Sequence, residues 1–167
     1  MTDKDIRENK TLVLGVGNEI LMDDGIGPKL VNRLRKNFHH PNLHYENICL
    51  GGLEIIEYIR DYRKVVIIDA IKTTTGTPGD VYLMTPDDFK ETLHLSTFHD
   101  VSFLTALELG KQLGFDIPPE ILIIAIEIVE DTLFGESFSP EIQSKYDQIY
   151  REICSFLEPA LYGEASI

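Results

Sequence analysis

A three-layer α/β fold with a mostly parallel sheet is the architecture that this sequence predicts. Short β-rich runs alternate along the chain with segments whose apolar residues recur every three or four positions, which are the patterns of buried strands and amphipathic helices. The clearest run is Lys64–Asp69 (KVVIID), which is β-branched and lacks polar alternation. Such runs are typical of parallel strands that helices cover on both faces.

Four further segments are predicted strands. Thr11–Val16 (TLVLGV) and Ile121–Ile128 are short and apolar, as buried strands are. His44–Cys49 shows a weaker strand pattern, and Asp80–Met84 is short enough for an edge or antiparallel strand. The turn-rich segment 73–79 (TTTGTPG) separates Asp80–Met84 from the strand before it.

Helical periodicity fills the intervals between these strands. The first helix is expected from near Asp24 to Phe38, because its apolar residues recur at steps of four and Pro28 fits only a first turn. The other helices are expected after the turn at Gly51 and Gly52, over Asp100–Gly114, and from Pro140 to near Pro159.

Length and composition bound the class of protein. The 167 residues fit one domain over residues 1–167, with residues 1–10 as a polar N-terminal extension. The formal net charge of −13 argues against nucleic-acid binding and against docking on anionic membranes. No apolar run is long enough to span a bilayer, and the charged start lacks the apolar stretch of a signal peptide. Two cysteines are too few for a disulfide framework, so we expect a cytoplasmic protein, and by default a monomer.

The acidic charge is concentrated toward the C-terminus. Residues 116–167 contain eleven acidic residues, and only Lys145 and Arg151 oppose them. One interpretation is a solvated helix face with polar loops, and the other is a surface that selects a basic partner.

Ligands of parallel α/β sheets bind beyond the carboxyl ends of the strands, which directs attention to the segments 15–24 and 69–79. The first of these begins with Gly15 and Gly17, but Ile20 stands where the dinucleotide-binding motif needs its third glycine. The two glycines are therefore interpreted as a tight turn from strand to loop.

Two acidic residues and one histidine are candidate ligands of a divalent metal. Asp24 precedes the first helix, Asp69 ends the clearest strand, and His99 precedes a later helix. Each has a structural alternative: Asp23 and Asp24 as a helix cap or helix-end charge, Asp69 as a turn cap, and His99 as a cap or solvated side chain. Together they form an incomplete ligand set, which leaves positions open as a catalytic metal centre requires.

Other catalytic patterns have less support. Serine-hydrolase and zincin motifs do not occur, and His94 is the one other histidine with a plausible route to the site. Cys49 and Cys154 have no flanking pattern of a nucleophile and are interpreted as small apolar residues.

Three motifs follow one another in the chain: LVLGVGNEILMDDGIGPKLV, then IIDAI, then STFHD. With these motifs the chain resembles the nickel–iron hydrogenase maturation endopeptidases, over most of its length from Thr11 to the last helix. The resemblance implies a twisted five-stranded α/β/α sandwich. It also implies an aspartyl-type endopeptidase that removes the C-terminal extension of a hydrogenase large-subunit precursor after nickel insertion.

The same resemblance implies a site and its partner. Asp24, Asp69 and His99 match the family's metal-binding residues and are the expected catalytic residues, with Asp24 standing where many relatives have Glu. The nickel is expected to arrive with the precursor, so no metal of the protein's own and no organic cofactor are expected. The nickel either assists hydrolysis or serves recognition only.

Two departures from the family pattern bear on the site and on substrate choice. Asn47 stands where the family has the acid of an Asp-Gly-Gly-Thr-type turn, and Val129-Glu130 replaces a common Pro-Glu pair. The loop 127–140 is therefore a candidate for selecting the precursor. Two rival functions stay open: a nucleotide- or small-molecule-binding domain built on the glycine turn, and a peptidase of the same fold with another protein substrate.

Overall fold

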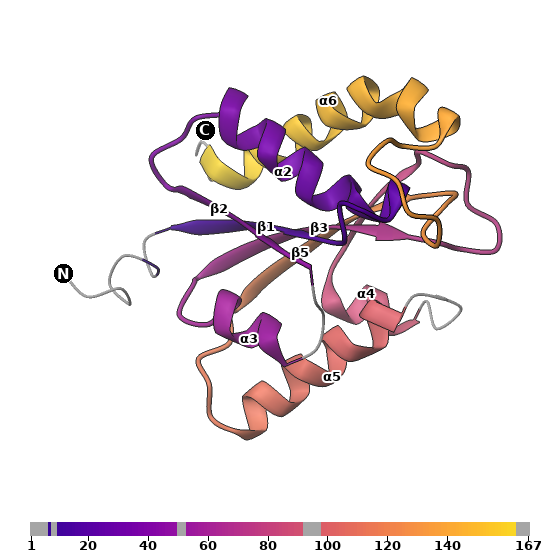
Figure 1. Cartoon of the computed structure of the whole chain (residues 1–167). Helices are drawn as coiled ribbons and strands as arrows, with labels where there is room; N and C mark the ends of the chain where they lie inside the picture. The colour runs from indigo at the N-terminus through magenta and orange to yellow at the C-terminus, as the bar shows by residue number, and fades with distance from the viewer. Residues whose placement is uncertain (1–6, 8–9, 50–52, 92–97, 163–167) are drawn as a thin grey trace.

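The computed structural model describes residue 7 and residues 10–49, 53–91 and 98–162, with the backbone alone over 89–91, 98–102 and 160–162. Helices lie on both faces of a central twisted sheet, as Figure 1 shows. Most of the polar extension predicted over residues 1–10 lies outside the described residues. No helix in the described ranges is both long and apolar enough to cross a membrane.

The sheet has five strands in the order β2-β1-β3-β5-β4. Its strands are β1 (Thr11–Val16), β2 (Leu43–Ile48), β3 (Lys64–Ile71), β4 (Val81–Met84) and β5 (Glu120–Glu127). All neighbours pair in parallel except β4, which is antiparallel to β5 at the edge of the sheet. The predicted parallel sheet with one antiparallel edge strand is thus confirmed.

Two helical layers cover the sheet. Helices α2 (Ile26–Asn37) and α6 (Pro140–Tyr162) lie on one face, above the sheet in Figure 1. Helices α3 (Glu54–Ile59), α4 (Pro86–Glu91) and α5 (Phe98–Gln112) lie on the other. These two layers explain why the central strands lack polar alternation, because either face of a strand meets a helix.

The side chains of β3 show how both faces are filled. Val65 and Ile67 join the apolar core on the α3 and α5 side, whereas Val66 and Ile68 join the core under α2 and α6. All four are buried, and burial of each aliphatic side chain contributes roughly 1.5–3 kcal/mol. The strand is therefore fixed in register by packing on two sides.

Glycines allow the loop after β1 to lie against the strand ends. Gly17 has φ +142°, and a Cβ atom there would lie 2.0 Å from the carbonyl oxygen of Asp24. A Cβ atom on Gly27 would lie 2.4 Å from the carbonyl oxygen of Ile68. The tight turn expected from Gly17 is confirmed, and the adjoining start of α2 packs directly on the end of β3.

The helices differ from the sequence expectation in two places. A 3₁₀ turn, η1 (Met22–Gly25), precedes α2, so the first helix begins at Ile26 rather than near Asp24. The short helix α4 was not predicted. The long final helix is confirmed: α6 begins at Pro140, and Pro159 lies in its last turn, where a proline interrupts few backbone hydrogen bonds.

We expect Gly17→Ala to destabilise the fold more than Gly114→Ala. Gly114 also has a positive φ, of +77°, but a Cβ atom there meets nothing within 4 Å. Strain alone therefore costs about 1–2 kcal/mol at Gly114, whereas strain and a backbone clash at Gly17 cost about 3 kcal/mol or more. Urea denaturation of the two variants measures the difference, and equal losses would contradict the close approach at Gly17.

Candidate functional site

The candidate site lies at the edge of the sheet where the parallel strands end. The loop after β1 crosses this edge as η1, and η1 contacts β3. The loop after β5 adjoins it, because the backbone N–H of Asp23 donates to the carbonyl oxygen of Glu130 at 3.0 Å. This edge is where ligands of α/β sheets bind.

Asp24 is buried in η1. Its Oδ2 atom accepts a hydrogen bond from the backbone N–H of Asn18 at 2.7 Å, which closes the loop between them. No side chain caps the start of α2, whose N-cap residue is Gly25. The helix-cap interpretation of Asp24 is therefore wrong, since its bond runs back into the loop.

Asp69 is half-buried near the end of β3. Its Oδ1 atom accepts a hydrogen bond from the backbone N–H of Ala70 at 2.7 Å. Side chains alternate along a strand, and the neighbours Ile68 and Ala70 face α2 and α6, so Asp69 faces the α5 side. The contact of η1 with β3 brings Asp24 and Asp69 to the same edge of the sheet.

His99 lies in the first turn of α5, and Figure 1 shows that α5 begins toward this same edge. Its side chain lies outside those described, and so does the whole of His94. Among the described side chains, no group of three or more His, Cys, Asp or Glu is placed to hold a metal ion. The elements that contain the three predicted ligands, η1, β3 and the start of α5, thus meet at one edge of the sheet. The ligand set itself stays a prediction.

Asp23 has a structural role that sequence reasoning missed. It is 0% exposed, and its carboxylate accepts four hydrogen bonds from across the chain. Ser139 donates through both its backbone N–H and its Oγ, each at 2.7 Å, and the N–H groups of Val129 and Glu130 donate at 3.2 and 3.0 Å. Asp23 lies in the first turn of η1, near the start of α2 as predicted, and its carboxylate also joins two loops through these buried hydrogen bonds.

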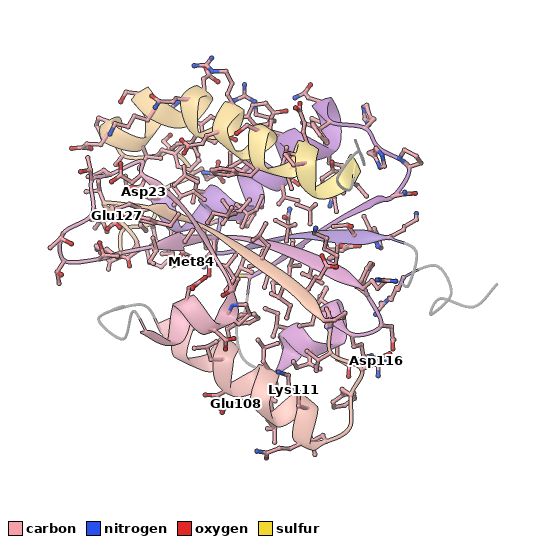
Figure 2. The ribbon with its side chains drawn as sticks, turned by 180° about the vertical axis from the view of Figure 1, so that it is seen from behind. Asp23, Met84, Glu108, Lys111, Asp116 and Glu127 are labelled. Atoms are coloured by element: carbon pink, nitrogen blue, oxygen red, sulfur yellow. The ribbon has the colours of Figure 1, made fainter. Side chains whose placement is uncertain are left out.

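Glu127 forms a second buried joint, at the end of β5. Its carboxylate accepts hydrogen bonds from the N–H of Thr73 at 2.7 Å and from the Oγ1 of Thr73 at 2.9 Å. The hydroxyl of Tyr82 donates to it at 3.3 Å. Figure 2 shows Asp23 and Glu127 at one end of the sheet and Asp116 at the other. Glu127 therefore holds the threonine-rich loop that follows Asp69.

Asn47 lies beside Gly15 in the pairing of β2 with β1. Its Nδ2 donates to the Oδ1 of Asn32 at 2.9 Å, and its own Oδ1 is buried without a hydrogen-bond partner among the described residues. Asn47 lines a hollow of about 350 Å³ together with Ile20 and Cys49. Cys49 is exposed there, whereas Cys154 packs against the core as expected.

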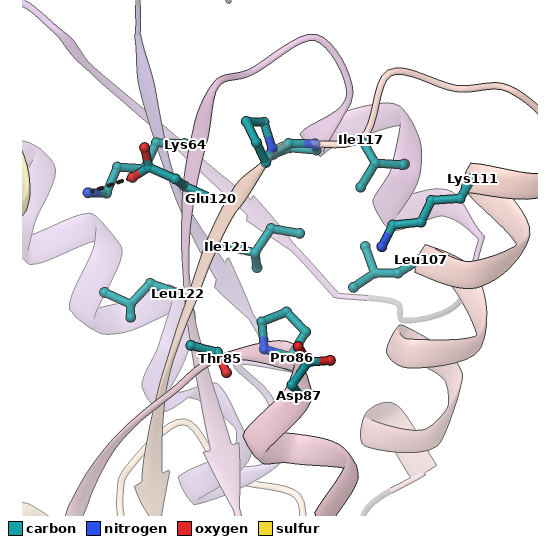
Figure 3. Close-up of a pocket in the computed structure, with 12 residues that line it drawn as sticks. Lys64, Thr85, Pro86, Asp87, Leu107, Lys111, Ile117, Glu120, Ile121 and Leu122 are labelled. Carbon is teal, nitrogen blue, oxygen red and sulfur yellow. Dashed lines mark ion pairs between the residues drawn. The ribbon is translucent and has the colours of Figure 1, made fainter.

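A second pocket lies at the other end of the strands. It has a volume of about 490 Å³ and runs along β5 beside the end of α5 (Figure 3). An ion pair of 3.3 Å joins Lys64 to Glu120 at its rim, and Leu107 and Lys111 line its α5 side. None of the predicted site residues lines this pocket, so it is not the site that the sequence indicates.

The loop after β5 is organised by Glu130. Its Oε1 atom accepts hydrogen bonds from the N–H and the Oγ1 of Thr132, at 2.7 and 2.6 Å, and from the N–H of Leu133 at 3.0 Å. These donors lower the pKa of the Glu130 carboxyl from 4.5 to about 2. The pairing of Leu21 with Gly135 then ties this loop to the loop after β1.

Comparison with known families gives one match over most of the chain. A family model described as hydrogenase maturation protease matches residues 28–156. The hydrogenase expression/formation protein HupD of Thiocapsa roseopersicina is 28% identical over 137 residues, which cover 80% of this chain and 61% of that protein. HupD of Rhodobacter capsulatus is 26% identical, over 84% of this chain and 68% of that protein. The chain therefore spans less than two thirds of the Thiocapsa relative.

Solved structures share the fold. The hydrogenase maturating endopeptidase HybD of Escherichia coli superposes with a TM-score of 0.75 at 18% identity, over 91% of this chain and 94% of that chain. The [NiFe] hydrogenase maturation protease HybD of Thermococcus kodakarensis superposes with a TM-score of 0.66 at 24% identity, over 89% and 98%. These likenesses confirm the five-stranded α/β/α sandwich.

We expect Asp23→Asn to lower the free energy of unfolding by about 2–3 kcal/mol. The NH₂ group of asparagine cannot accept the hydrogen bonds that one carboxylate oxygen of Asp23 accepts, so buried donors would lose their partner. The control Ser139→Ala removes one of the four bonds and costs about 1 kcal/mol. Urea denaturation at neutral pH measures both. A loss below about 0.5 kcal/mol for Asp23→Asn would show that its four hydrogen bonds contribute little to stability, as expected of a charge that only interacts with the helix end.

The Glu130 carboxyl is expected to titrate near pH 2. Because its pKa is lower in the folded chain than its ordinary value of 4.5, its bonds stabilise the loop above pH 4.5. This stabilisation is lost as the pH falls from 4.5 toward 2. Carbon-13 NMR titration of the side-chain carboxyl measures the midpoint, which should rise in Thr132→Val, where the hydroxyl donor is removed. A midpoint near 4.5 in the unmodified chain would contradict the loop geometry.

Proposed function

Because the chain belongs to the hydrogenase maturation protease family, we propose that it is an endopeptidase of nickel–iron hydrogenase assembly. Its substrate is a large-subunit precursor, from which it removes the C-terminal extension in the cytoplasm after nickel insertion. The observation that carries this proposal is the family match over residues 28–156, joined to the placement of Asp24 and Asp69 at one carboxyl edge.

The nickel of this proposal belongs to the substrate. Asp24 and Asp69 supply carboxylates, and His99 supplies an imidazole from the start of α5, so the set suits a borderline divalent cation. Three protein ligands leave coordination positions that the precursor's own ligands occupy. A precursor without nickel lacks this link to the enzyme, which makes metal insertion a checkpoint for cleavage.

The two carboxylates are oriented before the substrate arrives. A backbone N–H donates to Asp24 from Asn18, and another donates to Asp69 from Ala70. Hydrolysis of the scissile amide needs its carbonyl polarised and a water deprotonated, for which the substrate's nickel and a carboxylate are the available groups. In this scheme one of the two carboxylates serves as general base.

The nucleotide-binding alternative has less support from the loop after β1. Because Gly17 has no side chain, the carbonyl oxygen of Asp24 fits against it. The space beside this glycine is therefore filled by the chain's own loop and is not open to a phosphate. The acidic residues Glu19, Asp23 and Asp24 of this loop also disfavour an anionic ligand.

We expect Asp24→Asn, Asp69→Asn and His99→Ala each to slow cleavage by about 100-fold or more, because each removes a proposed metal ligand or base. The measurement is release of the C-terminal peptide from a nickel-loaded cognate precursor, followed by mass spectrometry. Asp87→Asn is the matched control, since Asp87 is exposed and lines the pocket at the other end of the sheet. Full activity in Asp69→Asn and His99→Ala, with circular dichroism unchanged, would refute the site assignment.

The nickel checkpoint is tested with two preparations of the same precursor. Release of peptide is expected from the nickel-loaded form and not from the nickel-free form. Equal release from both forms would refute nickel-dependent recognition, and no release from either would refute the proposed activity.

A further inference from the structure

Three large apolar side chains are exposed close to the candidate site. Ile20 is 51% exposed, Leu133 is 59% exposed and Phe134 is 82% exposed. Their two loops are joined by backbone hydrogen bonds, from the N–H of Gly135 to the oxygen of Ile20 at 2.9 Å and from the N–H of Met22 to the oxygen of Gly135 at 2.8 Å. We call these three side chains the apolar tip.

The apolar tip is held outward by ordered structure. The bonds to the Glu130 carboxylate fix the turn that carries Leu133, and the buried Asp23 carboxylate fixes both loops at their base. A loose loop would be free to fold its apolar side chains against the core. Apolar side chains that a rigid loop gathers on a surface mark an interaction site.

The position of the apolar tip connects it to the site. Ile20 also lines the hollow between the ends of β1 and β2. It lies in the loop that the Asn18–Asp24 hydrogen bond closes. A polypeptide bound at the carboxyl edge can therefore reach the apolar tip through this loop.

The charge around the apolar tip favours a basic partner over a second copy of this chain. Glu19, Glu130, Asp131 and Glu136 flank it in the two loops. Lys72 is paired with Asp131 at 2.8 Å, and Lys29 lies near Glu19 and Glu136, so these two lysines only partly balance the four carboxylates. Two chains that each carry a net charge of −13 repel one another, whereas a partner with basic side chains is attracted.

We propose that the apolar tip binds an apolar segment of the large-subunit precursor that is flanked by basic residues. This inference rests on the proposed function, and it assigns the tip to substrate affinity and precursor choice rather than to the hydrolysis step. Contacts that are equal in the bound substrate and in the transition state lower KM and leave kcat unchanged.

The test is steady-state cleavage of a nickel-loaded cognate precursor by Phe134→Ser, Leu133→Ser and the double variant. We expect KM to rise about 10-fold for Phe134→Ser and further for the double variant, with kcat unchanged. Phe134→Leu should restore most of the affinity, and added salt should raise KM of the unmodified enzyme.

The control is Leu113→Ser, because Leu113 is 63% exposed just after α5. The KM of this variant should equal that of the unmodified enzyme. An unchanged KM in the double variant, or a fall in kcat alone, would overturn the inference.

Two further measurements separate this inference from the proposed function. If the unmodified enzyme cleaves the precursor and the tip variants keep its KM, only the inference fails. If the unmodified enzyme does not cleave, the proposed function fails, and calorimetric binding of the same precursor decides the inference. Binding about 10-fold weaker in Phe134→Ser supports it, and equal binding overturns it. Analytical ultracentrifugation of the enzyme alone gives the last check, because a dimer that Phe134→Ser dissociates would assign the tip to self-association instead.

Discussion

The rest of the site depends on the buried carboxylate of Asp23. A carboxylate with no exposed surface must replace its lost hydration with hydrogen bonds, and here the donors come from Val129, Glu130 and Ser139. These donors lie in the loop between β5 and α6, while Asp23 itself adjoins Asp24. One buried group thus sets the position of the candidate site residue on one side and of the apolar tip on the other.

Much of the fold was predictable because its signals are local. The continuous apolar run of β3, the four-residue steps of α2 and the glycine after α5 each mark an element within a few positions. The later start of α2 has a local cause as well. The 3₁₀ turn before α2 keeps Asp23 and Asp24 outside the regular helix.

The sequence predicts the location of the candidate site residues, but not the buried hydrogen bonds that hold the loops around them. The rule that ligands gather at the carboxyl ends of parallel strands selected Asp24 and Asp69 from many acidic residues, and the structure brings both to that edge. The role of Asp23 depends on a contact with Ser139, which is 116 residues away, and no local pattern encodes such a contact. Of two adjacent buried acids, the sequence alone does not tell which one bonds to the loop after β5.

The amide at Asn47 changes the charge balance at this edge. The family pattern that the sequence resembles has an acid at this position. In this chain the neutral side chain of Asn47 bonds to Asn32 and packs beside Gly15. The edge therefore carries fewer negative charges than a site with an acid at this position, and a weaker field for an isolated cation. This weaker field fits the proposed function, in which the nickel arrives with ligands of the precursor and does not depend on the enzyme's own residues for its affinity.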